Sequence, residues 1–352
     1  MCTQILDVLR KNEKLVLWNR FRIHRNKKDF RQFVLDGYKN PDYVHMEHRG
    51  GEHVGKVIYL ADEMGSGLMG FFAELGVTLI KLYYADHRGF TPYVSWGDNY
   101  LYFEPDGIDG EKNAFLHYFK PVSEVSSIDN VAHLVISDDT HYDWVKAQFD
   151  AVSYDVSEEY VDAMADMVRK YIDYNERTKK YLQEQFESLV GTKKTIGVHY
   201  RGTDFKKAYN NHPVAVRLEQ AVETTKTLLK QKDGYYEQVF LATDDEEAVR
   251  TFKEAFGDKL CSYSDVFRED GGEESVAFSN NSREHHKYHL GLEVLRDQYT
   301  LTNCDALICG YSNVSFMTRI MRKAWHTEYF KDCILINNGI NHNDNSFSNS
   351  KH

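Results

Sequence analysis

The second half of the chain alternates between short apolar runs and longer segments with helical periodicity. Apolar runs occupy residues 194–200, 236–242 and 305–309, and each is followed by a segment whose apolar residues recur at helical spacing. A strand that is followed by a helix and then by another strand packs as a parallel sheet with helices on its faces. The sequence therefore predicts an α/β fold with a doubly wound, Rossmann-like sheet in this half.

The first half carries one similar unit. An apolar run at residues 56–61 leads into a Gly-rich turn that contains Gly65 and Gly67, and a long apolar helix is expected over residues 71–84. Such a turn brings a ligand close to backbone N–H groups at a helix N-terminus. No acidic residue clearly closes the next expected strand, so a dinucleotide site is not favoured.

The chain length of 352 residues suits two α/β domains. We predict a helical arm over residues 1–50, an N-terminal Rossmann-like domain over 51–156, a linker helix over 157–190, a C-terminal Rossmann-like domain over 191–336 and a disordered tail over 337–352. The tail is assigned from its high content of Asn, Ser and His.

The charge and the apolar content disfavour several classes of protein. A net charge of -11 argues against a nucleic-acid or anionic-membrane partner. No apolar run approaches the length of a membrane-spanning helix, and the N-terminus lacks the apolar core of a signal peptide. The five cysteines are widely spaced and form no CxxC pair, which is typical of reduced thiols. These features predict a cytoplasmic protein without an integral membrane span.

Polar residues follow three strands of the predicted C-terminal sheet, at the points where the strands end. The first group is His199, Arg201 and Asp204, the second is Asp244 and Asp245, and the third is Ser312, Asn313, Val314 and Ser315. In open α/β sheets, ligands bind beyond the carboxyl ends of the strands. A guanidinium there suits bidentate capture of a phosphate, and a helix that begins at the third group offers N–H groups and a favourable dipole. The three groups together predict a phosphorylated ligand.

Each group also has an explanation that needs no ligand. The polar residues after the first strand can form surface salt bridges. Thr243 and Glu246 have the spacing of a capping box, and Ser312 is a suitable N-cap. The occurrence of three such strand ends in one sheet, one of them with an arginine, favours the ligand-binding interpretation.

Other catalytic patterns are weaker. Asp138 and Asp139 resemble a paired-carboxylate metal site but lack flanking ligands, while His285, His286 and His289 lie in a charged segment without a nearby cysteine. The sequence contains no GxSxG, P-loop or HExxH motif. We therefore predict neither a metal site nor a serine hydrolase nor a P-loop NTPase.

The motif His199-x-Arg201-x-x-Asp204 resembles the first motif of the GDP-fucose-dependent α1,6-fucosyltransferases. This family includes the N-glycan core enzyme and the rhizobial Nod-factor enzyme, and it falls in the protein O-fucosyltransferase superfamily. Four further segments are similar to family segments: residues 65–67, 119–124, 239–245 and 296–312. All five segments follow the order of the family, and the resemblance spans residues 55–322.

The resemblance implies a two-domain GT-B glycosyltransferase that inverts the anomeric carbon and needs no metal or other cofactor. It places the donor, GDP-fucose, mainly on the C-terminal domain and a glycan or glycolipid acceptor on the N-terminal domain. The residues that it assigns are His199 and Asp297 at guanine, Arg201 at the β-phosphate, Asp244 and Asp245 as orienting carboxylates, Ser312, Asn313, Val314 and Ser315 at the diphosphate, Gly65 and Gly67 in the N-terminal turn, and Arg201 with Asp204 as catalytic residues. A fixed guanidinium and helix N–H groups would stabilise the charge that grows on the departing GDP.

The chain departs from the family at three positions. Gly202 stands where the core enzyme has a second arginine, and Asn313 stands where the family has a second serine. Tyr209 lies near the position of the glutamate that is proposed as the base in the core enzyme. We therefore expect a retained donor site, whereas the base stays open among Asp204, His212 and a carboxylate of the N-terminal domain.

These features predict transfer of fucose from GDP-fucose to a hydroxyl of a glycan or a lipid-linked oligosaccharide, in the cytoplasm or at the periphery of the inner membrane. Two alternatives stay open: the same scaffold could use another GDP- or NDP-sugar, and the missing glutamate is compatible with a non-catalytic protein that binds a sugar nucleotide or a glycan. Four aromatic residues of the N-terminal domain suit either stacking on sugars or ordinary packing: Tyr93, Trp96, Tyr100 and Tyr102. Neither the acceptor nor the oligomeric state is predicted.

Overall fold

The computed structural model of the protein describes residues 44–64, 69–149, 156–202, 207–268, 276–279 and 282–343. Gly65, Gly67 and Asp204 lie outside these ranges, as do the predicted arm up to residue 43 and the predicted tail from residue 344. The chain divides into two compact units, a smaller one within residues 1–59 and 127–136 and a larger one within residues 60–126 and 137–352. The domain boundaries predicted at residues 50, 156, 190 and 336 stay predictions. No helix within the described ranges has both the length and the apolar character that spanning a bilayer requires.

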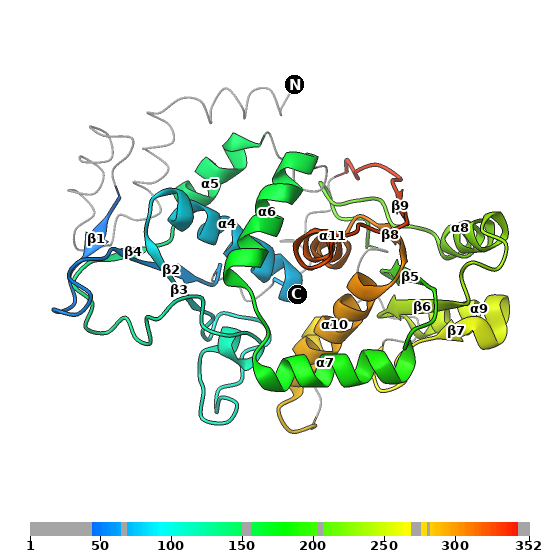
Figure 1. Ribbon diagram of the computed structural model, residues 1–352, viewed down its shortest axis with the longest axis horizontal. Helices are drawn as coiled ribbons and strands as arrows, with labels where there is room; N and C mark the ends of the chain where they lie inside the picture. The colour runs from blue at the N-terminus through cyan, green and yellow to red at the C-terminus, as the bar shows by residue number, and fades with distance from the viewer. Residues whose placement is uncertain are drawn as a thin grey trace. The chain divides into compact units, whose positions relative to one another are not determined.

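The elements of the first half include the strand and the helix that were predicted at residues 56–61 and 71–84 (Figure 1). They are β1 (Met46–Glu47), β2 (Ile58–Asp62), α4 (Phe71–His87), β3 (Thr91–Ser95), the 3₁₀ helix η1 (Ala114–His117), β4 (Leu134–Ile136) and α5 (Asp139–Gln148). In the smaller unit, β1 pairs with β4 in antiparallel fashion, and Met46 lies opposite Val135. In the larger unit, α4 begins at Phe71 as predicted and buries most of its length.

The aromatic residues of the first half form a packed cluster rather than an open platform. Trp96 and Tyr100 are buried, and the ring of Phe71 makes edge-to-face contacts with Trp96 at 5.9 Å and with Tyr118 at 4.9 Å between centroids. The indole N–H of Trp96 donates a hydrogen bond to Thr78 at 3.1 Å, which satisfies its polar atom inside the core. For Trp96 and Tyr100 the packing interpretation is therefore confirmed.

The predicted linker helix over residues 157–190 is two helices, α6 (Glu158–Tyr171) and α7 (Glu176–Leu189). Asn175 caps the second helix by accepting a hydrogen bond from a backbone N–H at 2.9 Å. Just before this cap, Tyr174 forms a backbone bridge with Phe119, and the two rings stack with centroids 5.7 Å apart. This packing against a distant segment interrupts the helical period that the local sequence suggests.

The second half repeats the strand–helix unit along its whole length. Its elements are β5 (Thr195–Tyr200), α8 (Leu218–Gln231), β6 (Gln238–Thr243), α9 (Glu246–Phe256), η3 (Gly257–Lys259), β7 (Leu260–Cys261), η4 (Val276–Phe278), α10 (His286–Asn303), β8 (Ala306–Gly310), α11 (Asn313–Trp325) and β9 (Asp332–Ile336). The described strands of this half form one parallel sheet in the order β7-β6-β5-β8-β9. The predicted α/β class and the doubly wound parallel sheet are confirmed.

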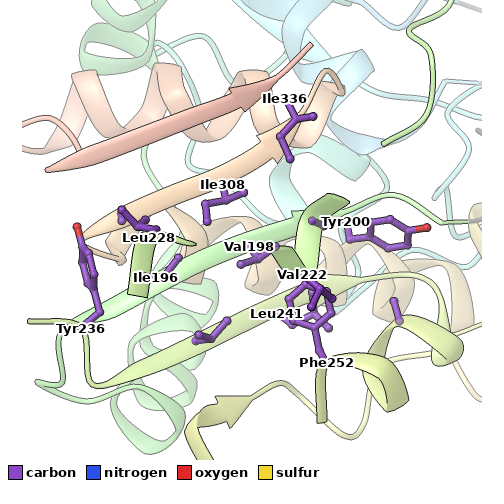
Figure 2. Close-up of a cluster of buried hydrophobic side chains, with 14 residues drawn as sticks. Ile196, Val198, Tyr200, Val222, Leu228, Tyr236, Leu241, Phe252, Ile308 and Ile336 are labelled. Carbon is purple, nitrogen blue, oxygen red and sulfur yellow. The ribbon is translucent and has the colours of Figure 1, made fainter. Parts of the chain in front are cut away.

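The two faces of this sheet pack against different helices. Ile196 and Val198 on β5 belong to a buried cluster that also contains residues of α8 and α9. Figure 2 shows this cluster, with Phe252 as its largest residue from α9. Gly197 faces the other side, where a Cβ would lie only 3.1 Å from the sulfur of Cys304. Since side chains alternate along a strand, His199 shares the face of Gly197. The pleat therefore turns His199 toward the side on which α10 packs.

The strand order of the sheet reverses at β5. The strands β6 and β7 extend the sheet on one side of β5, and β8 and β9 extend it on the other. His199 at the end of β5 lies opposite Ala242 of β6 and Cys309 of β8. Ligands of such sheets bind in the crevice beyond the carboxyl ends of the strands at the reversal. The topology therefore places the residues that follow β5 and β8, Arg201 and Ser312 among them, at the expected crevice.

Candidate functional site

A cavity that is partly open to solvent lies at the carboxyl edge of the C-terminal sheet. The predicted site residues that line it are His199, Arg201, Asp244, Asp297 and Val314. Residues that follow β5 and β6 thus meet residues of α10 and α11 around one space, as the topology requires.

The remaining predicted residues lie beside this cavity or outside the described ranges. Ser312 lines a smaller pocket of about 280 Å³ together with His199 and Arg201. Asn313 and Ser315 line a third pocket, of about 330 Å³, to which Ser312 also contributes. For the residues outside the described ranges, Gly65, Gly67 and Asp204, the assigned roles stay predictions.

His199 is held by two serines of the α11 N-terminus. Its Nδ1 lies 2.9 Å from the hydroxyl oxygen of Ser315 and 3.3 Å from that of Ser312. Burial and the neighbouring charge of Arg201 lower the pKa of His199 to about 4. The imidazole is therefore neutral at physiological pH, and it can hydrogen-bond a ligand without adding a second positive charge beside Arg201.

Asp244 organises the turn that follows β5. One carboxylate oxygen accepts a hydrogen bond from the backbone N–H of Gly202 at 2.9 Å, and the other lies 3.4 Å from Nε of Arg201. The Arg201 side chain is about one-third exposed (29%) at the crevice. Because Asp244 approaches the Nε edge, it orients the guanidinium plane, which suits a bidentate contact with an anion.

Gly202 is required by the close approach of Asp245. A Cβ at position 202 would lie 2.5 Å from the Cβ of Asp245, which is too short for a non-bonded contact between two carbon atoms. Asp245 cannot withdraw easily, because it is buried and caps α9 by accepting a hydrogen bond from the N–H of Glu247 at 2.9 Å. The cap of this helix is thus Asp245 rather than Thr243, and the site has no room for the family's second arginine.

The first turn of α11 borders the same crevice. Ser312 caps the helix by accepting a hydrogen bond from the backbone N–H of Ser315 at 3.1 Å, and the two hydroxyl oxygens lie 2.9 Å apart. Asn313 is exposed, whereas Val314 is buried at the wall of the main cavity. A helix N-terminus carries a partial positive charge, so it adds to the field of Arg201 at this edge.

Asp297 brings a carboxyl group into an apolar part of the cavity. It lies on α10 and is only 9% exposed, with Leu290, Val294 and Phe267 among the neighbouring lining residues. Burial raises the pKa of Asp297 to about 7, although the charges of Arg296 and Arg268 act in the opposite direction. A buried carboxyl group in a cavity with a strongly raised pKa is a typical feature of a ligand site.

Several lining residues were not found by sequence reasoning. Tyr102 comes from the first half of the chain, and Phe267 comes from an irregular stretch after β7 that has no sequence signature. Glu293 had a usable signal, since it precedes Asp297 by four residues on one helix and therefore shares its face. Its carboxylate accepts a hydrogen bond from the backbone N–H of Phe267 at 3.2 Å.

Two candidates for a general base among the described residues, His212 and Glu74 of the first half, do not line this cavity. His212 contacts the backbone oxygen of Asn210 at 3.1 Å through Nδ1, on the segment that precedes α8. In the first half, Glu74 is buried beside the end of β2, where it accepts a hydrogen bond from the N–H of Met64 at 3.2 Å. Burial raises the pKa of Glu74 to about 7, in spite of the opposing charge of Lys81. The identity of the base stays a prediction among Asp204, His212 and a carboxylate of the N-terminal domain.

The carboxylate pair that resembled a metal site has a structural role. Asp138 is the N-cap of α5 and accepts hydrogen bonds from the N–H groups of Thr140 at 2.7 Å and His141 at 3.2 Å. Over the described residues, no group of three His, Cys, Asp or Glu side chains is arranged to hold a metal ion.

The chain is similar to solved fucosyltransferase structures at low sequence identity. A structure of NodZ α-1,6-fucosyltransferase soaked with GDP-fucose is 17% identical, with 76% of this chain and 92% of that chain covered and a TM-score of 0.45. A structure of fucosyltransferase NodZ from Bradyrhizobium is 16% identical over 76% and 92% of the two chains, with a TM-score of 0.42. A structure of POFUT1 in complex with GDP is 10% identical over 82% and 98%, with a TM-score of 0.45. No protein-family model and no curated protein matches the sequence.

Proposed function

We propose that this protein is an inverting, metal-independent glycosyltransferase of the GT-B type that transfers fucose from GDP-fucose to a hydroxyl of a glycan or a lipid-linked oligosaccharide. The observation that carries the proposal is the presence of Asp297 and Arg201 in one cavity whose remaining lining is largely apolar. The order of the five family-like segments along the chain supports the same conclusion.

The carboxyl group and the apolar walls suit a guanine base. Guanine presents two N–H donors on one edge, its ring N–H and its amino group, and an ionised carboxylate accepts both. Asp297 supplies this carboxylate, and Phe267 and Val266 supply apolar surface for the ring. Uracil offers a single ring N–H on the equivalent edge, and adenine offers an acceptor there, so the arrangement favours a guanine nucleotide.

The positive charge at the edge of the cavity suits the diphosphate. The guanidinium of Arg201, oriented by Asp244, can bind phosphate oxygens in bidentate fashion. The N-terminus of α11 adds N–H groups, and its cap Ser312 lies in the adjoining pocket together with Arg201. When the sugar leaves, negative charge grows on the diphosphate, and these fixed groups stabilise it without having to reorganise.

The acceptor side of the proposal rests on the sequence. We assign the acceptor to the N-terminal domain, predicted over residues 51–156, and the nucleotide sugar to the C-terminal domain, predicted over residues 191–336. Asp204, the last residue of the motif that contains Arg201, remains the first candidate for a catalytic carboxylate. We place the protein in the cytoplasm or at the periphery of the inner membrane.

Turnover of the sugar nucleotide tests the proposal. We expect the purified protein to release GDP from GDP-fucose faster than from GDP-mannose, and a pool of oligosaccharide acceptors should increase the rate. The assay measures free GDP by coupled absorbance, and heat-denatured protein gives the background. Faster release from GDP-mannose would replace the donor sugar in the proposal.

A second candidate function is supported by one observation. Tyr209, near the position of the family's proposed base, is buried and carries no carboxylate. This favours, as the alternative, a protein that binds a sugar nucleotide without transferring the sugar. Tight GDP binding combined with no release of GDP from either donor, with or without acceptors, would select this alternative.

A further inference from the structure

Two stretches outside the sheet supply apolar walls of the cavity. Val266 and Phe267 belong to the segment that follows β7, and Val276 and Ala277 belong to η4. Neither stretch is part of the sheet, so strand pairing does not fix the position of these walls. Their hydrogen bonds and ion pairs show that both are attached to α10, the helix that also carries Asp297.

Arg296 attaches the first wall to α10. Its guanidinium is fully buried and binds the carboxylate of Asp265 in bidentate fashion, with N–O distances of 2.7 and 3.0 Å. The guanidinium lies over the ring of Tyr263 at 3.9 Å, and one terminal nitrogen also donates a hydrogen bond to the hydroxyl of Tyr181 at 2.9 Å. The planar fork of an arginine is needed to make these contacts at the same time.

Glu293 attaches the first wall at a second point, one turn earlier on α10. One carboxylate oxygen accepts the hydrogen bond from the backbone N–H of Phe267. The other lies 2.5 Å from a terminal nitrogen of Arg283, in the stretch that leads into α10. The carboxylate is only 9% exposed, so this pair is poorly screened by solvent.

Lys287 attaches the second wall. Its ammonium group donates hydrogen bonds to the backbone oxygens of Ala277 at 3.1 Å and Ser279 at 3.2 Å. The preceding residue, His286, adds a second contact, since its Nε2 lies 3.2 Å from the hydroxyl oxygen of Ser279. Both walls are therefore fixed to the helix that presents Asp297.

We propose that Arg296, Glu293 and Lys287 are positioning residues that set nucleobase specificity by holding the two walls at a fixed distance from Asp297. The inference rests on the proposed function, since it takes the cavity as the site of the base. The three residues need not touch the ligand. They act by keeping the two walls close together, so that the planar ring of the nucleobase is held with its N–H donors at the carboxylate of Asp297. Arg201 and the N-terminus of α11, the proposed phosphate-binding groups, lie on other elements. Substitutions of the three positioning residues therefore leave phosphate binding unchanged.

Selective binding of GDP over UDP tests this inference. The variants are Arg296→Lys, which keeps the charge but removes the fork, and Lys287→Met, which keeps the stem but removes the donors. A matched control is Arg322→Lys, because Arg322 binds the backbone oxygens of Thr302 and Cys304 at the other end of α10. Calorimetry gives the Kd of each nucleotide. We expect GDP to bind about tenfold more weakly to both test variants, with UDP affinity unchanged, and we expect the control to retain the full selectivity.

The outcomes separate the inference from the proposed function. If the unaltered protein binds GDP and both folded variants keep its selectivity for GDP over UDP, the inference is wrong and the proposed function stands. If GDP and UDP weaken equally, the residues have only a structural role, which also overturns the inference. If Arg296→Lys does not give a cooperative thermal transition, Lys287→Met decides alone, since its side chain is only half-buried. If the unaltered protein does not bind GDP, the proposed function is wrong and the inference fails with it.

Discussion

Replacing Arg201 with alanine is expected to weaken GDP binding by about 100-fold, because two charge-assisted hydrogen bonds to the diphosphate are lost, at about 1.5 kcal/mol or more each. Asp244, which orients the guanidinium, would then be left as an excess negative charge beside the phosphates. The turnover of GDP-fucose should fall by a larger factor than the affinity, since negative charge on the diphosphate increases as the sugar leaves.

Calorimetry with GDP measures the first of these effects, and initial rates of GDP release measure the second. Arg217→Ala is a suitable control, because Arg217 is an exposed arginine at the start of α8. The variant Arg201→Lys should recover part of the affinity but not the full rate, since an ammonium group lacks the bidentate geometry. Unchanged GDP affinity in Arg201→Ala would show that the diphosphate does not bind beyond β5.

Replacing Asp297 with asparagine is expected to lower GDP affinity by roughly 100-fold at pH 8, because an amide offers one acceptor and one mismatched donor to the two N–H groups of guanine. The unaltered protein should bind GDP more tightly at pH 8 than at pH 6, since the carboxyl group, whose pKa is about 7 in the empty cavity, must ionise to accept both hydrogen bonds. The variant should show no such pH dependence. Asp258→Asn serves as a control, because Asp258 is fully exposed.

The same substitution is expected to stabilise the fold at high pH. In the unfolded chain Asp297 has a pKa near its usual value of about 3.9, and burial raises this pKa to about 7 in the folded protein. The stability contributed by the protonated group is therefore fully present below pH 4 and is lost as the pH rises through 7. Asparagine does not titrate, so the free energy of unfolding of the variant, relative to that of the unaltered protein, should be higher at pH 8 than near pH 4 by roughly 4 kcal/mol, at about 1.36 kcal/mol per unit of pKa shift.

Urea denaturation at pH 4 and at pH 8 measures this difference. A variant that binds GDP poorly and yet unfolds at higher urea concentration at pH 8 would show that the carboxylate is retained for binding rather than for stability. A variant that is less stable than the unaltered protein at pH 8 would contradict the environment assigned to Asp297.

The strands that carry the site could be predicted because they are buried on both faces. The expected runs at 194–200, 236–242 and 305–309 agree closely with β5, β6 and β8, each a nearly continuous apolar stretch. The short strand β7, with two residues, and the edge strand β9, with its charged first residue, do not produce such a signal. The break between α6 and α7 was also missed, since it depends on the packing of Tyr174 against a segment more than fifty residues earlier.

The candidate site could be predicted only in part. His199, Arg201 and Ser312 follow buried strands, so the parallel topology alone brings them to one edge. Asp297 lies in the middle of a helix, and only the resemblance to the fucosyltransferases indicated it. The walls around Phe267 and Ala277 come from stretches outside the sheet. Contacts with Glu293, Arg296 and Lys287 set their position, and no local sequence pattern reveals these contacts.

Calorimetry of the unaltered protein with GDP, UDP and ADP at pH 8 shows whether the cavity beyond β5, β6 and β8 binds a guanosine diphosphate. We expect one GDP site per chain, with an affinity at least about tenfold higher than for UDP or ADP, since each good hydrogen bond to a charged group contributes about 1.5 kcal/mol or more. No heat of binding with GDP, or equal affinities for the three nucleotides, would contradict this expectation.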